Sequence, residues 1–277
     1  MTQPLLYVAA PVVEPYRYGL FGAAQPIEGD DLHWQLGVEW EPLACYAANF
    51  YLAGLRCSTG VGDPAKALPA GEPTTKAHPF AVYAGMECGS VGYDHDGSYQ
   101  QRARTILELA GQHAAEAALW TGAGGNSGPM NAATTPIVQA AASDLTTAIG
   151  VLEDWLADHY SGVGVIHAKR GVNAHARRHH QTVRDPANPE ALTTGLGTRW
   201  VFGGGYDGTG PAAVAPAAGQ TWIYATGQLT IRRAPVTDFT MAEALDRSIN
   251  DVAVFAEQPY VIGFDCAIGA ALVDLSL

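Results

Sequence analysis

The sequence predicts a mixed α+β fold, in which strands precede and follow a middle section that contains helices. Apolar residues recur with helical spacing in two long segments, 94–125 and about 142–159. Short runs rich in aromatic and β-branched residues come before and after these segments. We find no internal repeat of solenoid period. The 277 residues are enough for one large domain or two small ones.

Charge and cysteine content restrict the class of function. The chain has 15 Lys and Arg against 27 Asp and Glu, a net charge of −12. Tight binding of nucleic acid through its phosphates needs a basic face, which this composition does not favour. Only 15% of residues are charged, which suits a surface hidden against partners in an obligate assembly.

We expect cytosolic synthesis, because residues 1–19 lack a signal-peptide pattern and no apolar run reaches the ~18 residues of a membrane span. The cysteines do not have zinc-finger spacing, and we therefore expect buried, reduced thiols. The four cysteines are Cys45, Cys57, Cys88 and Cys266.

The first third of the chain predicts loose and extended structure. Residues 1–31 carry four prolines and show no clean period, which favours an extended arm over a packed element. Strand-like residues at 33–54 and 80–93 flank the segment 59–79, whose prolines and glycines predict a protruding loop. Together they predict a long hairpin that extends away from the core.

The segment 94–125 contains the clearest long helix. Asp96 or Ser98 can cap its start, and Gly122 with the following glycines ends it. We expect its apolar stripe to face a sheet closely, because small residues dominate that stripe. The stripe consists of Ile106, Leu109, Ala110, Ala114, Ala117 and Ala118.

Shorter elements complete the chain. A helix at about 142–159 is capped by Ser143 or Asp144, a buried strand follows at 162–168, and a helix with a polar face is expected at 170–183. A capping box of Thr240 and Glu243 predicts a short helix near 240–248. The remaining expected strands are 198–202, 221–233, 252–257, 259–265 and 267–275.

Three glycines, Gly203, Gly205 and Gly208, match the G-x-G-x-x-G pattern of dinucleotide-binding loops. Such a loop must open a helix, because the pyrophosphate binds at the N-terminus of that helix. Here Pro211 and Pro216 follow, and no acidic residue lies about 20 positions further on to hold a ribose. We therefore interpret the run as a wide turn between two strands and expect no cofactor.

Two further patterns also have simpler interpretations. Ser127 lies in a G-x-S-G-like context, but His113, the nearest upstream histidine, is inside the predicted helix, so a flexible helix exit is favoured over a protease nucleophile. His175 and His179 have the i, i+4 spacing of zinc ligands, but no glutamate lies between them and two arginines do.

A solvated or inter-subunit helix face is the favoured interpretation of this histidine cluster, which also contains His167 and His180. The cluster of Asp94, His95 and Asp96 is explained by helix capping. We expect no catalytic, cofactor-binding or metal-binding residues.

Four stretches resemble major capsid proteins of tailed bacteriophages with the Johnson fold (the Hong Kong 97 type) and, more distantly, encapsulin shells. They are "PFAVYAGMECGSVGY", "AALWTG", "LGTRWVFGGGYDGTGP" and "WIYATGQLTIRR". The order of the predicted elements is also similar. The resemblance implies an N-terminal arm (1–34), strands with an extended loop (35–93), a spine helix of the peripheral domain (94–125), an axial domain (126–235) and closing strands of the peripheral domain (236–277).

The resemblance implies a structural protein that assembles with itself into hexamers and pentamers of an icosahedral head around double-stranded DNA. We expect a virion protein assembled in the host cytoplasm, with no tight DNA binding and no membrane contact. Portal, scaffold and decoration proteins are further candidate partners. Candidate subunit-interface residues are Arg17, Tyr18, Lys66, Lys76, Gly203, Gly205, Tyr206 and Gly208.

Certain members of the family crosslink a loop lysine to a neighbour's asparagine. Lys66 and Lys76 lie in the matching loop, but no partner asparagine or catalysing glutamate is identifiable, so we expect no crosslink. Two alternatives stay open: an encapsulin-like compartment with enzyme cargo, and an oxidoreductase that uses the glycine loop. In a shell protein, mutation of Gly205 would disturb assembly and nothing else. In an oxidoreductase, the same mutation would abolish cofactor binding.

Overall fold

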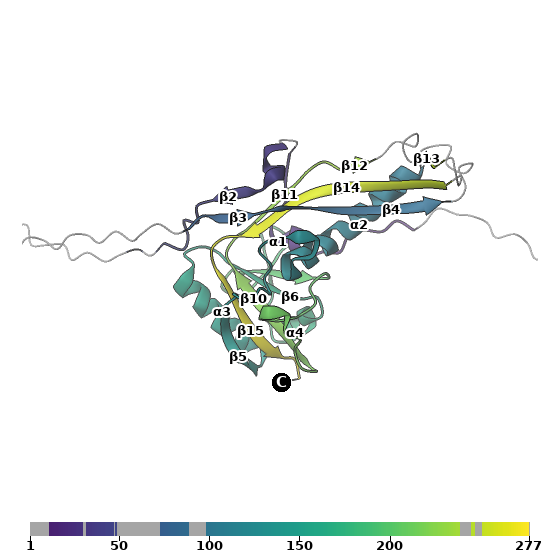
Figure 1. Ribbon diagram of the computed structural model, residues 1–277. Helices are drawn as coiled ribbons and strands as arrows, with labels where there is room; N and C mark the ends of the chain where they lie inside the picture. The colour runs from purple at the N-terminus through teal and green to yellow at the C-terminus, as the bar shows by residue number, and fades with distance from the viewer. Residues whose placement is uncertain are drawn as a thin grey trace, which may run out of the picture.

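The computed structural model describes residues 11–29, 32–46, 48, 73–88, 98–238, 245–246 and 251–276. Two sheets organise this part of the chain (Figure 1). A long six-stranded sheet carries the helix α2 (Ser98–Thr121), and a compact unit around a seven-stranded sheet lies below it. The α+β fold class predicted from the sequence is confirmed.

The six-stranded sheet is built around the long strand β14 (Asp251–Phe264), which runs antiparallel to β4 (Pro79–Cys88) along the full length of β4. The strands expected at 252–257 and 259–265 are therefore one strand. Pro259 is tolerated because its N and its carbonyl face the same side, beyond the end of β11, where no ladder bond needs its missing N–H; its carbonyl accepts there from Ala234 N. The other strands are β11 (Leu229–Arg233), β12 (Thr237–Asp238), β13 (Leu245–Asp246) and β1 (Ile27–Glu28).

The prediction of a helix near 240–248 is wrong for the two residues of that segment that the structure describes, because Leu245 and Asp246 form strand β13 against β14. Pairing with a long neighbouring strand decided the conformation there over the local capping pattern. The other residues of that segment lie outside the described ranges.

The predicted hairpin, with strands at 33–54 and 80–93 around the loop 59–79, has the wrong second strand, because the partner strand comes from the end of the expected loop. Strand β2 (Val38–Trp40) pairs antiparallel with β3 (Thr75–Ala77). The segment expected as the second strand of the hairpin forms β4 instead and pairs with β14. Most of the expected loop 59–79, including Lys66, lies outside the described residues, as does the cluster of Asp94, His95 and Asp96.

The prediction that residues 1–31 contain no packed element is wrong for their second half. A short helix α1 (Leu20–Ala23) buries Leu20 completely, and β1 adds to the six-stranded sheet beside β11. Both elements are too short to show a period in the sequence, and tertiary contacts hold them in place. A short 3₁₀ turn follows at Leu32–Leu36.

The compact unit contains a mixed sheet with the order β5-β15-β10-β6-β9-β8-β7. Helices α3 (Leu145–His159) and α4 (Val172–Arg178) cover one face, and α2 packs with the other. Asp144 caps α3 by accepting from Thr147 N at 3.1 Å, as one of the two expected caps. The strands are β5 (Ile137–Ser143), β15 (Ile268–Asp274), β10 (Gln220–Thr226), β6 (Val165–Lys169), β9 (Arg199–Gly203), β8 (Leu192–Thr193) and β7 (Val183–Arg184).

The chain crosses between the two sheets twice at one place, which we call the crossing (residues 227–228 and 265–267). The strand expected at 221–233 is two strands, because the chain leaves β10 at Gly227 and enters β11 of the other sheet. Gly227 N donates to Ala267 O and Asp265 N donates to Gln228 O, each at 2.9 Å. These bonds tie the two crossing segments together.

Candidate functional site

Three segments meet on the side of α2: residues 16–23, the middle of α2 and the glycine loop 203–210. We call this place the junction. Its centre is Glu116, whose side chain is fully buried. One carboxylate oxygen accepts from Leu20 N at 3.0 Å, and the other accepts from Gly205 N at 2.9 Å and from the Tyr16 hydroxyl at 2.5 Å. A single carboxylate on α2 therefore contacts one segment 100 positions earlier in the sequence and another 89 positions later.

Burial dominates the electrostatics of the junction. Loss of solvent raises the pKa of the Glu116 carboxyl, and the donors at Gly205, Tyr16 and Leu20 act against that rise. Burial and the nearby Glu116 also raise the pKa of the Tyr16 hydroxyl, which keeps it protonated as a donor. The junction therefore contains a buried acid, and its hydrogen bonds offset only part of the cost of burying it. Removing the acid would leave its buried donors without an acceptor, which is costly.

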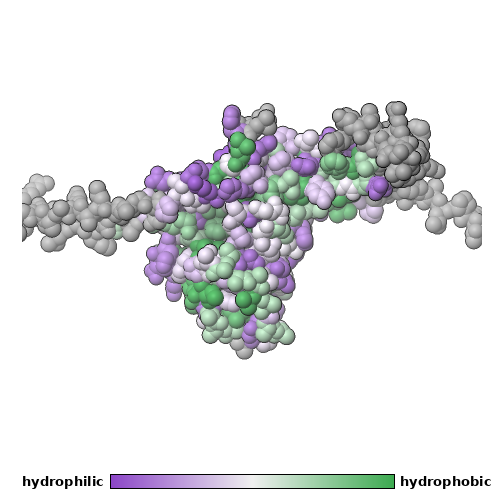
Figure 2. Space-filling model, viewed as in Figure 1, coloured by the Kyte–Doolittle hydropathy of each residue, from purple (hydrophilic) through white to green (hydrophobic). Residues whose placement is uncertain are grey.

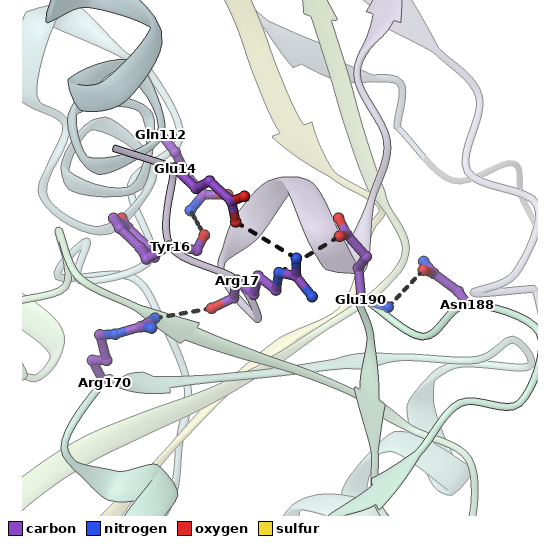
Figure 3. A network of polar contacts seen from close by, with 7 residues as sticks. All are labelled: Glu14, Tyr16, Arg17, Gln112, Arg170, Asn188 and Glu190. Atoms are coloured by element: carbon purple, nitrogen blue, oxygen red, sulfur yellow. Dashed lines mark hydrogen bonds and ion pairs between the residues drawn. The ribbon is translucent and has the colours of Figure 1, made fainter. Parts of the chain in front are cut away.

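Neighbouring side chains hold the same N-terminal segment from both sides (Figure 3). Gln112, one turn before Glu116, donates to Tyr16 O at 3.1 Å and accepts from Phe21 N at 3.2 Å. From the compact unit, Arg170 donates to Arg17 O at 3.0 Å, and its guanidinium lies 4.5 Å from the centroid of the Tyr16 ring. The segment is therefore clamped between α2 and the compact unit.

Arg17 and Tyr18, two candidate interface residues, lie at the outer end of this clamp. The Arg17 side chain is exposed and approaches Glu14 at 3.7 Å and Glu190 at 3.9 Å. Such exposed ion pairs contribute little to stability. Tyr18 has φ 63°, and its carbonyl accepts from Phe202 N at 2.9 Å. A role for either residue in subunit contacts remains a prediction.

The glycine loop packs directly on α2. A Cβ atom at Gly205 would lie 2.1 Å from His113 O, so only glycine allows this approach. Trp120 is fully buried, with its ring centroid 4.6 Å from that of Tyr206 and 4.8 Å from that of Tyr224. Close packing of the loop backbone on α2 therefore explains the glycine at 205.

The loop does not have the geometry of a dinucleotide-binding loop. It leads from β9 through a three-residue 3₁₀ turn (Pro211–Ala213) to β10, so it opens no α-helix. The amide of Gly205 already donates to Glu116, whose carboxylate would repel a phosphate. The interpretation as a turn between two strands is confirmed.

The remaining candidate interface residues that the structure describes, all but Lys66, have contacts within their own chain. Tyr206 is only 3% exposed, and the ring of Tyr206 fills the space beside Gly203. Gly208 has φ +80°, which favours glycine. Lys76 on β3 is exposed and lies 3.4 Å from Glu39 across the hairpin. Their part in subunit contacts remains a prediction, and Tyr206 has almost no free surface to offer a partner.

The histidines do not form one site. His167 is buried, bonds the Tyr206 hydroxyl and Thr226 Oγ1 at 2.9 Å each, and has a pKa that burial lowers to about 3. His175, His179 and His180 lie on or next to α4. In the described ranges no group of three His, Cys, Asp or Glu is placed to hold a metal ion. Ser127 is exposed just after the turn Ala123–Gly125 that follows α2.

The expectation of reduced thiols is wrong for two cysteines. Cys45 and Cys266 form a disulfide with their Cα atoms 6.3 Å apart. They are 221 positions apart in the sequence, so only the fold brings them together. No helix among the described residues is long and apolar enough to cross a membrane.

No family model matches the sequence, and no curated protein matches it. Solved structures do. The capsid of an empty GTA particle aligns with a TM-score of 0.59 at 13% identity, over 98% of this chain and 94% of that one. A chain of Mycobacterium phage Bobi aligns with a TM-score of 0.54 at 14% identity, over 98% and 95%, and one of Mycobacterium phage Adephagia with 0.53 at 11%, over 96% and 95%. Over nearly its whole length, therefore, this chain has the Johnson fold of phage capsid proteins.

Proposed function

We propose that this protein is the major capsid protein of a phage-like particle, a structural subunit that assembles with itself around double-stranded DNA. The observation that carries the proposal is the fold shared with phage and GTA capsids over 96–98% of the chain. The junction supports a structural role over an enzymatic one, because its polar groups bond one another and hold chain segments together. The encapsulin and oxidoreductase alternatives gain no support.

In this proposal the five segments inferred from the resemblance keep their roles, from the arm at 1–34 to the closing strands at 236–277. The subunits form hexamers and pentamers in the host cytoplasm and end up in the virion, with portal, scaffold or decoration proteins as further candidates for contact. Figure 2 shows apolar side chains on the visible surface of the compact unit, which suits packing against other copies. Its exposed apolar residues include Ile137, Val163, Val183, Leu196 and Val214.

Particle size tests the proposed function. The protein is expressed alone and studied by light scattering and negative-stain microscopy. We expect megadalton shells, tubes or ring-shaped capsomers. A chain that stays a monomer or dimer at high concentration would contradict the proposal, and a co-purified cargo enzyme inside closed shells would favour the encapsulin alternative.

The two lateral edges of the seven-stranded sheet carry opposite charge. The β5 edge with α3 (residues 137–160) has four acidic residues and no Lys or Arg, and Asp154 and Asp158 there are exposed. Towards the opposite edge, α4 and β7 (residues 172–184) have three arginines, Arg177, Arg178 and Arg184, and no acidic residue before Asp185. In a ring with head-to-tail contacts, the basic edge of one subunit would meet the acidic edge of the next.

We expect the double variant Arg177→Glu/Arg178→Glu to reduce assembly at low salt by about tenfold or more, because like charges would then face each other. Both side chains are exposed, so the fold should persist, as circular dichroism can check. Adding Asp154→Arg and Asp158→Arg in the same chain restores opposite edges and should restore the assembled fraction. Sedimentation at several salt concentrations measures it. Equal assembly of all three proteins would contradict the ionic contact.

A further inference from the structure

The disulfide between Cys45 and Cys266 joins the hairpin base to the crossing. Cys266 lies between β14 and β15, where the chain passes from one sheet to the other. Cys45 follows β2, in the stretch 41–46 that continues from the hairpin. Both cysteines are half-buried and pack against the apolar cluster under α3. The bond therefore links the hairpin to the point that both sheets share.

Among the described residues, apolar packing and two hydrogen bonds also hold the hairpin base: Ala77 is buried in a cluster with Val261, and Trp40 packs against that cluster. Trp40 Nε1 donates to Asp265 Oδ1 at 3.2 Å, and Ser161 N donates to Ala44 O at 2.7 Å. Asp265 itself is fixed, since its other carboxylate oxygen accepts from the Tyr160 hydroxyl at 3.3 Å. Two hydrogen bonds of ordinary strength contribute only modestly to stability. A covalent link adds a restraint of a different order to the hairpin base.

We propose that Cys45 and Cys266 are a site of oxidative crosslinking that fixes the hairpin base to the crossing, and that a small-molecule disulfide such as oxidised glutathione closes it. Thiols stay reduced in most cytosols, so the pair is a dithiol when the chain is made. The two half-buried cysteines line a groove of about 400 Å³ beside Trp155, which gives a small disulfide access.

The chemistry is a double thiol–disulfide exchange. One cysteine thiolate attacks a sulfur of the small disulfide, forms a mixed disulfide and releases one small thiol. The other cysteine thiolate then attacks the protein sulfur of the mixed disulfide and releases the second small thiol. The protein pair loses two electrons and two protons, and the small disulfide gains them.

This inference rests on the proposed function only for the time at which the crosslink closes. A capsid that leaves its host cell moves from reducing to oxidising surroundings, so the crosslink would close after assembly. The crosslink forms within one subunit and does not require a neighbour. Its chemistry can therefore be tested on the unassembled chain, separately from particle formation.

The first test counts thiols in the variant Cys57→Ser/Cys88→Ser, which keeps only the pair. After oxidised glutathione, we expect no maleimide label on the unfolded chain, and two labels after a phosphine reductant. A non-reducing gel should show a monomer. Two labels after oxidation, a stable glutathione adduct or a ladder of covalent oligomers would overturn the proposal. Peptide mapping of the wild-type chain should find the same pair.

The second test measures what the crosslink does. Hydrogen exchange of residues 38–46 should be about tenfold slower in the oxidised than in the reduced protein, with β9 unchanged as the internal control. Reduction should lower the thermal midpoint by roughly 5–10 °C. The variant Cys45→Ser/Cys266→Ser should show neither response. If the hydrogen exchange rate and the thermal midpoint of the wild type do not change with the redox state, the anchoring role is overturned. This outcome does not depend on whether the protein forms particles.

Discussion

Replacing Gly205 by alanine is expected to lower the free energy of unfolding by about 3 kcal/mol or more, because the added methyl group has no space. Its Cβ would lie 2.1 Å from His113 O and 2.8 Å from Ala117 N, both backbone atoms of α2. Neither atom can move without distorting the helix. The loop must therefore shift away, which also removes the Gly205 amide from Glu116.

Urea unfolding of the unassembled chain measures this effect, and Gly195→Ala is the matched control. A Cβ at Gly195 meets nothing within 4 Å, so the same chemical change should alter stability by less than about 0.5 kcal/mol. Equal stability of the two variants would contradict the close packing of loop and helix. The expected loss within a single chain differs from the sequence-based expectation that Gly205 affects assembly only.

Long helices were predictable from the sequence because their local apolar pattern agrees with their tertiary packing. Helix α3 begins after Asp144 and buries Leu152, as its apolar spacing predicts. Helix α2 was also predicted, but its buried face was predicted only in part: Ala118 is buried as expected, and other members of the expected stripe are not. Ile106 is 42% exposed, whereas Leu107 and Leu119 are buried. In an alanine-rich helix several faces are apolar, so spacing alone does not decide which one meets the sheet.

Contacts between distant segments were not predictable from the sequence. The pairing of Cys45 with Cys266 and the role of Glu116 both depend on where the chain crosses between sheets. One signal was present: Glu116 is the only acidic residue in the alanine-rich second half of α2 (residues 109–121), at a position that the fold buries. Buried acids of this kind are retained where backbone donors surround them. The positions of those donors, Leu20 and Gly205, come only from the fold.

Replacing Glu116 by alanine is expected to lower the free energy of unfolding by about 3–5 kcal/mol, because three buried donors lose their acceptor. Two of these are backbone amides, Leu20 and Gly205, and the third is the Tyr16 hydroxyl. The control is Glu108→Ala on the same helix, where the side chain is exposed and the change should stay within about 0.5 kcal/mol. Equal effects at both positions would show that the junction is not stabilising.

The pH dependence of the same site has a definite sign. Burial in the folded chain raises the pKa of Glu116 above its ordinary value of 4.5, so the folded state holds this proton more tightly than the unfolded state. The stabilisation from the protonated form is full below about pH 4.5 and is lost as the pH rises through the folded pKa. Glu116→Gln cannot titrate, so it isolates this contribution from all other groups.

We therefore expect the difference in unfolding free energy, wild type minus Glu116→Gln, to be largest near pH 4.5 and to fall towards pH 7. Urea titrations of both proteins across this range measure it. A difference that grows with pH would mean that the three donors outweigh burial and that Glu116 is stabilised as the carboxylate. In that case the junction would loosen on acidification instead of tightening, because protonation would then weaken the bonds that hold residues 16–20 against α2.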